Sequence, residues 1–588
     1  MTTPLRRREF LAGSGGVGLA GVAGCLEAAE DGPGAADDGA VEHPSADAAA
    51  IVSQHRLATD AGLEVLEGGG TAADAAVAVA CALSVVEPWF SSALGGGTWA
   101  LYYDAEVEEV TSVDGVGPVG AEATVEDFEE RAGDDGIHQA IVPGAWDGWM
   151  LWLERYGALD LAEVLAPAID LGREGYPISP EMAGWLDRGA DEIGDRSAAA
   201  AIYAPNGEFL EEGDTVYQRE MADTFESLAE VYADRLDEGE SEAIQAARDH
   251  FYRGPIADAI VEYADEHGGY LTREDFRGFE AEIVEPISIE YGDVEVYQNP
   301  PNSQGITQLL ALNKLAAHDF SGLESDDADA VHAQVEAIKL AFADRYHHVG
   351  DPDRVDVPVD ELLSEEYAAS QRDRIEMDEA REWPIDSGIE STDADHTTTF
   401  HVVDGNGNAA AVTTSLGAQF LVIGDTGIHI NNRMRMLAVD EGNPNRLTPG
   451  YKVRHTSNPY MALRDGRPYV LGGNTGVDTQ PQGQTQQFLH VVEFGLDAQE
   501  AIDHPRFVST AFPSTQYPYE YENTVQVESD YPSALIEELE NRGHDVEEGG
   551  SFGSATMIVV DEDGDRVQVG AEPRISTAEG RVSPPDEG

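Results

Sequence analysis

The chain has few cysteines and almost no lysine. Its 588 residues include two cysteines, Cys25 and Cys81, and only three lysines. Two cysteines cannot build a disulfide framework. Cys81 lies within the apolar run Ala75–Val86, so we expect it to be a small core residue.

Positive charge is equally scarce. There are 34 Lys and Arg residues against 113 Asp and Glu, a formal net charge of −79. Such a surface repels a phosphate backbone and anionic lipid headgroups, so we exclude nucleic acid as a partner. The acids are spread along the whole chain, and their mutual repulsion is screened by salt. We therefore expect a salt-adapted protein; the alternative is an ordinary acidic one.

Long hydrophobic runs are also missing. The stretch Ala72–Val86 is apolar, but it is short and carries Asp74, so it is not a convincing membrane span. The N-terminus reads instead as an export signal: Arg7-Arg8-x-Phe10-Leu11 resembles a twin-arginine motif, followed by a Gly/Ala/Val run.

The end of this signal resembles a lipobox. Val22-Ala23-Gly24-Cys25 predicts lipidation of Cys25 after cleavage, although a cysteine there by chance is the alternative. We expect residues 1–25 to be the signal and 26–43 an acidic tether. The protein would be exported and held at the outer face of the cell membrane by its lipid.

In the rest of the chain, the predicted secondary structure changes at residue 396 from mainly helices to mainly strands. Residues 47–86 read as two helices, and residues 352–396 as a polar, poorly periodic, mobile stretch. Further helices are expected at 124–131, 145–156, 160–174, 219–235, 242–250, 255–267, 326–345, 484–495 and 532–541. Strands are expected at 99–103, 285–298, 398–403, 409–414, 427–431, 460–464, 468–472, 555–560 and 566–570. We thus expect a helix-rich region 44–396 and a strand-rich region 397–588.

Several motifs fail on their context. Gly549–Gly553 matches a nucleophile elbow but is followed by a strand where a helix is required. Asp561–Asp565 imitates a calcium loop, but Arg566 occupies the glycine position. The His347-His348 pair reads as solvent-exposed, and no spacing of His, Cys and carboxylates resembles a zinc site. We expect no metal and no organic cofactor.

One pattern carries chemistry. His396-Thr397-Thr398-Thr399-Phe400 opens a hairpin directly after the polar stretch. If the chain is cut before a threonine, the freed α-amino group, with a pKa near 8, can act as the base for its own hydroxyl. The alternative is that these are ordinary β-branched strand residues.

A family resemblance favours the first interpretation. The chain resembles the γ-glutamyltransferase family of glutathione hydrolases and related acylases, in blocks that follow the family's order from about 47 to 580. The blocks are Ala58–Gly70, Ala73–Val77, Val86-Glu87-Pro88, Gly95-Gly96-Gly97, Val142-Pro143-Gly144, Ala166–Leu171, Pro300–Ile306, Thr397–Asn408, Asn431-Asn432 and Gly553-Ser554.

The resemblance implies an α+β fold, the four-layer αββα sandwich of N-terminal-nucleophile hydrolases. It implies a proenzyme that cuts itself between His396 and Thr397 into two fragments that stay together as a heterodimer. Thr397 would attack a small-molecule amide and pass the acyl group to water or an amine. Ser415 falls where the family supports the nucleophile, and Gly476 and Val477 fall where backbone N–H groups form the oxyanion hole. Valine in place of the family's glycine restricts φ there.

Two departures concern substrate recognition. The family holds a glutamyl carboxylate with an arginine in the stretch that matches Ser112–Pro118, and this chain has none there. The acid that follows the Asn-Asn pair in the family is also missing. Arg433 could instead bind a carboxylate of a different acyl group, or form a structural ion pair. His455 and Thr456 replace two serines and are the other candidate substrate-binding residues, although His455 could simply be a hydrogen-bonded core residue.

Three functions remain open at this stage. The first is a γ-glutamyltransferase-like threonine amidohydrolase or acyltransferase. The second is an acylase or amidase of the same family acting on another acyl group, as Gln480-Pro481-Gln482 and Arg433 suggest. The third is an uncut, surface-anchored binding lipoprotein, which the intact Thr397-Thr398 pair disfavours.

Overall fold

The computed structural model describes residues 43–44, 48–131, 133–383, 397–417, 420–561 and 566–583. The predictions for the signal, the tether up to residue 42, Cys25 and His396 therefore lie outside the described residues. His43, the last residue of the predicted tether, instead pairs with Val567 in a short strand. Within the described part of the chain, none of the helices has both the length and the apolar character needed to cross a bilayer.

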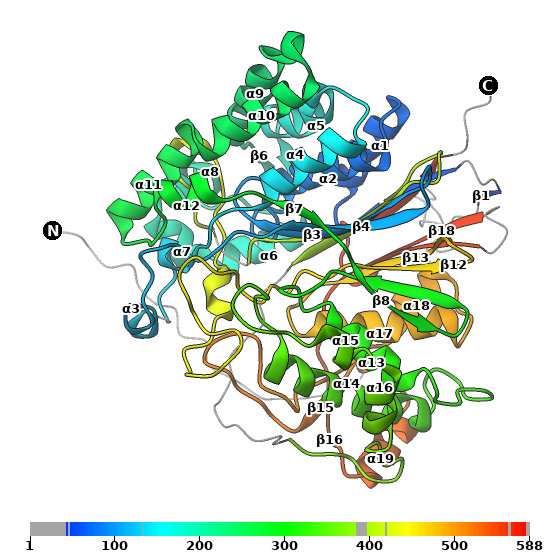
Figure 1. Ribbon diagram of the computed structural model, residues 1–588. Helices are drawn as coiled ribbons and strands as arrows, with labels where there is room; N and C mark the ends of the chain where they lie inside the picture. Colours follow the sequence, from blue (N-terminus) through cyan, green and yellow to red (C-terminus); the bar gives the residue numbers. More distant parts are fainter. Residues whose placement is uncertain are drawn as a thin grey trace, which may run out of the picture. The chain divides into compact units, whose positions relative to one another are not determined.

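Two large antiparallel sheets form the centre of the fold (Figure 1). Among the described residues, each has seven strands. In spatial order the first contains β1 (His43–Pro44), β18 (Arg566–Ala571), β17 (Ala555–Val560), β13 (Arg467–Asn474), β12 (Tyr460–Arg464), β9 (Val294–Gln298) and β8 (Ile287–Tyr291). The second contains β19 (Glu579–Ser583), β2 (Ala49–Ser53), β10 (Thr398–Val403), β11 (Ala409–Ser415), β3 (Gly97–Asp104), β4 (Glu109–Gly115) and β7 (Glu282–Val284).

A helical layer covers the outer face of each sheet (Figure 1). Over the second sheet lie α1 (Arg56–Glu67), α2 (Ala72–Val86), α4 (Ala145–Tyr156), α5 (Leu161–Glu174), α9 (Arg219–Ala233) and α10 (Glu240–Tyr252). Over the first lie α13 (Ile306–Leu315), α14 (Ala328–His348), α17 (Thr479–Val492) and α18 (Ala498–Asp503). The order helix, sheet, sheet, helix confirms the predicted αββα sandwich.

The remaining elements are shorter or peripheral. They are α3 (Val125–Glu130), α6 (Pro180–Arg188), α7 (Ala190–Asp195), α8 (Ser197–Tyr203), α11 (Pro255–His267), α12 (Arg273–Gly278), α15 (Val359–Leu362), α16 (Glu365–Arg372) and α19 (Ser533–Asn541), with a three-stranded sheet of β14 (Phe507–Ser509), β15 (Thr524–Val527) and β16 (Asp545–Glu548), and a pair formed by β5 (Tyr176–Pro177) and β6 (Thr215–Val216).

Side-chain alternation explains why the sheets stack. On β10, Phe400 and Val402 pack against the helices. Val403 points to the opposite face, where it belongs to the same hydrophobic cluster as Leu471 and Ile558 of the first sheet. The sheets come very close at Gly473, where a Cβ would lie 2.0 Å from Thr399 Oγ1. Strand β10 is therefore buried on both faces.

Both regions of the chain contribute to both sheets. In the second sheet, β10 and β11 lie between β2 and β3, so strands that follow residue 396 pair with strands that precede it. In the first sheet, β12 pairs with β9 in the same manner. A break before Thr397 would leave these hydrogen-bonded ladders intact.

Three local predictions were wrong. Residues 49–53 form the buried strand β2 where a helix was expected, because a short apolar run fits either element. Residues 427–431 form no named strand, only a bridge between Val422 and His429. The described part of the polar stretch contains α15 and α16, which bury Leu362 and Ala368 despite their weak periodicity.

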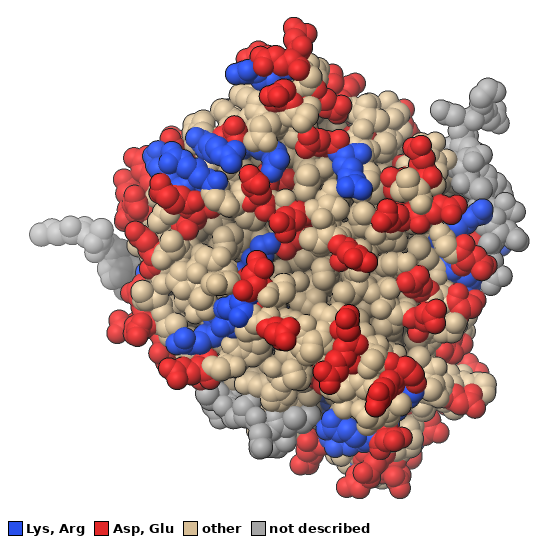
Figure 2. All heavy atoms as spheres, viewed as in Figure 1, with Lys and Arg blue, Asp and Glu red and all other residues tan. Residues whose placement is uncertain are grey.

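The acidic surface is visible in Figure 2, where red side chains are spread over the displayed face and occupy more of it than blue ones. All three lysines are in ion pairs: Lys314 Nζ lies 3.0 Å from Asp344, Lys339 Nζ 2.8 Å from Glu336, and Lys452 Nζ 2.6 Å from Asp114. Lys314 and Lys339 are also buried. Lysine is thus used mainly for internal pairing.

Candidate active site

Thr397 immediately precedes β10, in the middle of the second sheet, and is 1% exposed. The antiparallel register pairs Thr398 with Thr414, which brings Ser415 opposite Thr397. Their hydroxyl oxygens lie 3.1 Å apart. The hairpin predicted from the sequence therefore brings two of the predicted site residues together.

Two further side chains complete the surroundings of this hydroxyl. Gln480, in the first turn of α17, donates from Nε2 to Thr397 Oγ1 at 3.2 Å. Arg433 Nη1 donates to Ser415 Oγ at 2.9 Å. Because Ser415 Oγ accepts from Arg433, its own hydrogen can be donated to Thr397. Two donors directed at one oxygen stabilise negative charge on it.

The predicted oxyanion residues lie in the loop between β13 and α17. Gly476 has φ +92° and Val477 has φ +52°. Within the described chain, neither backbone N–H donates a hydrogen bond. A positive φ is rare for a β-branched residue and marks a position held by its surroundings. Gln304 supplies that hold, donating from Nε2 to the Val477 carbonyl at 2.8 Å.

A second contact stiffens the same loop. Arg345 Nη1 donates to Gln304 Oε1 at 2.6 Å and to Asp478 Oδ1 at 2.5 Å. The loop precedes the N-terminus of α17, where the helix dipole adds positive potential. The structure thus places a pair of N–H groups three and four residues before Gln480, the residue that contacts Thr397.

Arg433 is fully buried in the short 3₁₀ turn Arg433–Met436. Besides Ser415, it contacts the Asn432 side-chain oxygen at 3.2 Å. Gly417 makes this arrangement possible, since a Cβ there would lie 2.5 Å from Arg433 Nη2. The guanidinium is therefore connected to the Thr397 hydroxyl through the Ser415 hydroxyl.

His455 and Thr456 lie in the same neighbourhood, and both are fully buried. His455 Nδ1 accepts from the Ser457 backbone N–H at 3.2 Å, so its proton is on Nε2. Burial first, and then the positive charge of Arg433, hold the pKa of His455 well below its ordinary value. The ring is neutral. In the described chain, Nε2 of His455 and Oγ1 of Thr456 have no hydrogen-bond partner.

The two stretches in which the resemblance implies an amino-acid clamp are occupied by other contacts in the structure. In the stretch Ser112–Pro118, Ser112 accepts from Asn299 and Asp114 pairs with Lys452. Asn431 is used structurally: its side chain bonds to Gly95 and to both backbone groups of Ile141. The first stretch therefore lacks the arginine, and the second lacks the acid, that the resemblance implies for holding a glutamyl group.

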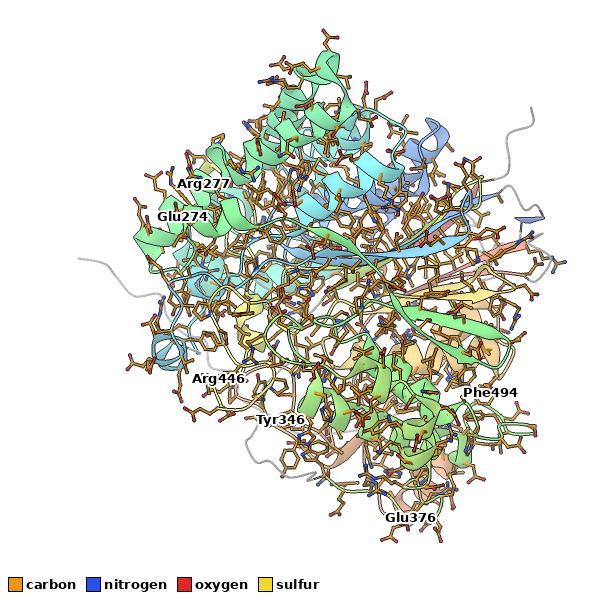
Figure 3. All side chains as sticks on the ribbon, in the orientation of Figure 1. Glu274, Arg277, Tyr346, Glu376, Arg446 and Phe494 are labelled. Carbon is orange, nitrogen blue, oxygen red and sulfur yellow. The ribbon has the colours of Figure 1, made fainter. Side chains whose placement is uncertain are left out.

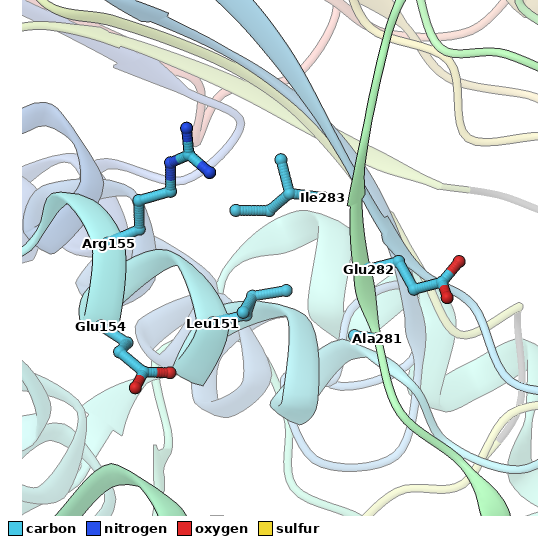
Figure 4. Close-up of a pocket in the computed structure, with 6 residues that line it drawn as sticks. All are labelled: Leu151, Glu154, Arg155, Ala281, Glu282 and Ile283. Carbon is cyan, nitrogen blue, oxygen red and sulfur yellow. The ribbon is translucent and has the colours of Figure 1, made fainter. Parts of the chain in front are cut away.

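A pocket of about 440 Å³ adjoins the loop of Gly476 and Val477. Its wall includes Phe512, Tyr521 and Phe552. A larger pocket, of about 710 Å³, lies between α4 and β7 (Figure 4). None of the predicted site residues lines that second pocket, so the chemistry is not expected there.

The structure also identifies a residue to which the sequence analysis assigned no role. Glu87, 5% exposed, accepts from Thr398 Oγ1 at 3.1 Å, next to the candidate nucleophile. Burial raises the pKa of Glu87 from its ordinary 4.5 to about 7. The Val86-Glu87-Pro88 block was the only signal of it in the sequence.

We expect this carboxyl to make folding stability fall with pH. Folded Glu87 holds its proton more tightly than unfolded Glu87, so its contribution is lost as pH rises from about 4.5 to about 7 and is level above that. Glu87→Gln should remove a fall of about 3 kcal/mol. Denaturant titrations from pH 4 to 8 measure it, with the exposed Glu106→Gln as control; parallel profiles of wild type and Glu87→Gln would contradict it.

Among the described residues, one group of histidine and carboxylate side chains has the spacing needed to hold a metal ion. His332, Glu336 and His544 lie together, although 212 residues separate the two histidines. None of the predicted site residues belongs to this group.

Comparison with known proteins places this geometry in a family. The model of the gamma-glutamyltranspeptidase family matches residues 58–581. The glutathione hydrolase-like YwrD proenzyme of Bacillus subtilis is 34% identical over 89% of this chain and 96% of its own length. The acylase ACY 1 proenzyme of Pseudomonas sp. (strain SE83) is 31% identical over 84% of this chain and 87% of its own length.

A solved structure agrees with these relatives. Cephalosporin acylase from Bacillus halodurans superposes with a TM-score of 0.81 and 31% identity, covering 95% of this chain and 99% of that one. The family match covers every strand of the two central sheets except β1 and β2, ends within β19, and includes every described site residue from Glu87 to Gln480. The resemblance inferred from the sequence blocks is confirmed: this chain is an enzyme of the gamma-glutamyltranspeptidase family.

Proposed function

We propose that this enzyme is a self-processing threonine amidohydrolase that acts through an acyl-enzyme on Thr397. The observation that carries the proposal is the Thr397 hydroxyl itself, buried between Ser415 and Gln480 at the start of β10. In this family, two activities fit such a site: transfer of a γ-glutamyl group, and hydrolysis of another small acyl amide.

Turnover begins with the α-amino group of the cut chain taking the Thr397 hydroxyl proton. Oγ1 attacks the amide carbon, and the N–H groups of Gly476 and Val477 stabilise the oxyanion. The C–N bond breaks, the proton passes to the leaving amine, and an ester remains on Thr397. Water, activated by the same amino group, releases the acid; an amine acceptor would give a new amide instead.

Self-processing uses the same hydroxyl. Thr397 Oγ1 attacks the carbonyl carbon of His396, the bond between this carbon and the Thr397 nitrogen breaks, and the hydroxyl proton passes to the nitrogen, which becomes the free amine of Thr397. Water then hydrolyses the ester, leaving a larger fragment that ends at His396 and a smaller one of residues 397–588. Because strands of one fragment pair with strands of the other in each sheet, the product is a heterodimer.

Of the two activities, we favour hydrolysis of an acyl amide whose far end is a carboxylate. Arg433 supplies a buried guanidinium beside Ser415, and His455 and Thr456 present two further polar atoms close by. The missing clamp disfavours a γ-glutamyl group, which carries an ammonium as well as a carboxylate. The named acylase relative supports this choice.

Two measurements test the proposal. Intact mass and N-terminal sequencing in high salt should find two fragments, the smaller beginning at Thr397. Glutaryl, oxamate-type and γ-glutamyl amides are then compared, and the first two should be hydrolysed faster. A chain that stays uncut on incubation would contradict self-processing. Faster hydrolysis of the γ-glutamyl amide would favour the γ-glutamyl activity instead.

We further propose that residues 1–25 direct export and that Cys25 carries the lipid anchor. The motifs Arg7-Arg8-x-Phe10-Leu11 and Val22–Cys25 support this. Cys25→Ala should move the enzyme from the membrane fraction to the medium without changing its activity. An unchanged membrane fraction would contradict the anchor.

Salt dependence is a separate expectation from the charge. With a net charge of −79, raising KCl from about 0.1 M to about 1 M should raise the melting temperature by roughly 10 °C, because the screening length falls from about 10 Å to about 3 Å. Calorimetry measures this, with glycine betaine at equal osmolality as the uncharged control. A flat response would indicate an ordinary acidic protein.

A further inference from the structure

Two imidazoles and a carboxylate are buried together where α14 packs against α19 and the turn after it. His332 and Glu336 are four residues apart on α14 and share one helix face, and His544 follows α19. One ligand atom from each of the three lies within 4.8 Å of the others. Their exposed fractions are 0%, 1% and 5%. Figure 3 labels Glu376, whose backbone borders the cluster.

Hydrogen bonds fix which imidazole atom of His332 is available. Its Nε2 lies 3.0 Å from the backbone carbonyl oxygen of Glu376. A carbonyl only accepts, so Nε2 carries the proton and Nδ1 carries the lone pair. This Nδ1 lies 2.8 Å from His544 Nε2, a hydrogen bond that a shared metal ion would replace. An N–H bonded to a backbone carbonyl on the far side of the ring is how metal-binding histidines are oriented.

The carboxylate of Glu336 is only half satisfied. Its Oε1 accepts from Lys339 Nζ at 2.8 Å and from the Arg381 backbone N–H at 3.1 Å. Its Oε2 is buried and has no hydrogen-bond partner in the part of the chain that the structure describes. Burying a carboxylate oxygen without a partner is costly, so this atom indicates a ligand.

We propose that His332, Glu336 and His544 bind a divalent transition-metal ion, with Zn²⁺ the best fit. Two imidazole nitrogens and one carboxylate oxygen are a zinc donor set, whereas Ca²⁺ and Mg²⁺ prefer oxygen alone. His332 and Glu336 precede Thr397 in the chain and His544 follows it. The ion would therefore connect the region that precedes Thr397 to the region that follows it. This proposal does not depend on the reaction that Thr397 performs.

The positive charge of Lys339 lowers the affinity of this site for a metal ion. Its Nζ lies 3.5 Å from His544 Nδ1. When His544 ligates through Nε2, its proton sits on Nδ1 and faces the ammonium group. Lys339→Gln removes the charge and supplies an amide oxygen that can accept this N–H. We expect the substitution to tighten zinc binding by roughly tenfold.

The test uses the whole protein, stripped with a chelator and titrated with Zn²⁺ while bound metal is measured by mass spectrometry. We expect one Zn²⁺ per chain. Glu336→Gln and His544→Gln should each weaken binding about 100-fold or more. The double variant His347→Ala, His348→Ala removes an exposed histidine pair outside the cluster and should bind as wild type does.

A spectroscopic measurement covers the case in which the ligand variants do not fold. Co²⁺ added to the stripped wild-type protein should give the visible absorption of a tetrahedral, imidazole-ligated ion, and Zn²⁺ should displace it. An octahedral spectrum, or zinc bound equally well by His544→Gln and lost in the His347, His348 variant, would overturn the proposal.

Discussion

Replacing Thr397 by alanine is expected to leave a single chain, uncut between residues 396 and 397, and to reduce amide hydrolysis by at least about 10⁴-fold. The substitution removes the one oxygen on which Ser415 and Gln480 converge. Both steps use that oxygen, so both should fail together. Denaturing electrophoresis follows the cut, and release of amine from a chromogenic amide follows turnover.

Thr397→Ser is the matched control, since it keeps the hydroxyl and the amine and loses only a methyl group. It should still cut itself and turn over, at a reduced rate. Thr397→Ala should fold as wild type does, because the strand ladder of β10 is unchanged. Two fragments from Thr397→Ala, or turnover near the wild-type rate, would sink the assignment of the nucleophile.

Local pattern was enough for much of the fold. The helices at 145–156 and 255–267 were predicted with their observed ends, since capping glycines and a first-turn proline mark them. The hairpin of β10 and β11 was also predictable, and its register alone brings Ser415 beside Thr397. Contacts that lie within one turn or one hairpin can be worked out from the sequence.

Contacts between distant segments could not be predicted in this way. Gln480 reaches Thr397 across 83 residues, and Glu87 reaches Thr398 across 311. His544 meets His332 only because α19 packs on α14. The spacing of residues in the sequence does not reveal such contacts. The expectation of no metal site was therefore based only on local motifs, and these could not include His544 with His332. Their roles depend on how the layers stack.

Arg433→Met is expected to lower kcat/KM for an amide with a carboxylate-bearing acyl group by about 10²–10³-fold, mainly through KM. The variant keeps most of the side-chain volume of a fully buried residue and removes the charge together with the hydrogen bonds to Ser415 and Asn432. An amide with a neutral acyl group of the same length should change only a few-fold. Steady-state kinetics on the two substrates measure the difference.

The comparison of substrates separates two roles of the same guanidinium. Arg433 also donates to Ser415 Oγ, the hydroxyl that contacts Thr397. If that support were its main role, Arg433→Met would lower kcat for both amides equally, and the carboxylate assignment would be wrong. Arg435→Met is the control two residues away: its side chain is 30% exposed and lies 3.9 Å from Asp135. Like Arg433→Met, Arg435→Met removes a positive charge from this turn, but it should leave the hydrolysis of both substrates unaffected. Arg433 is the carboxylate-binding residue only if Arg433→Met slows hydrolysis of the anionic amide specifically.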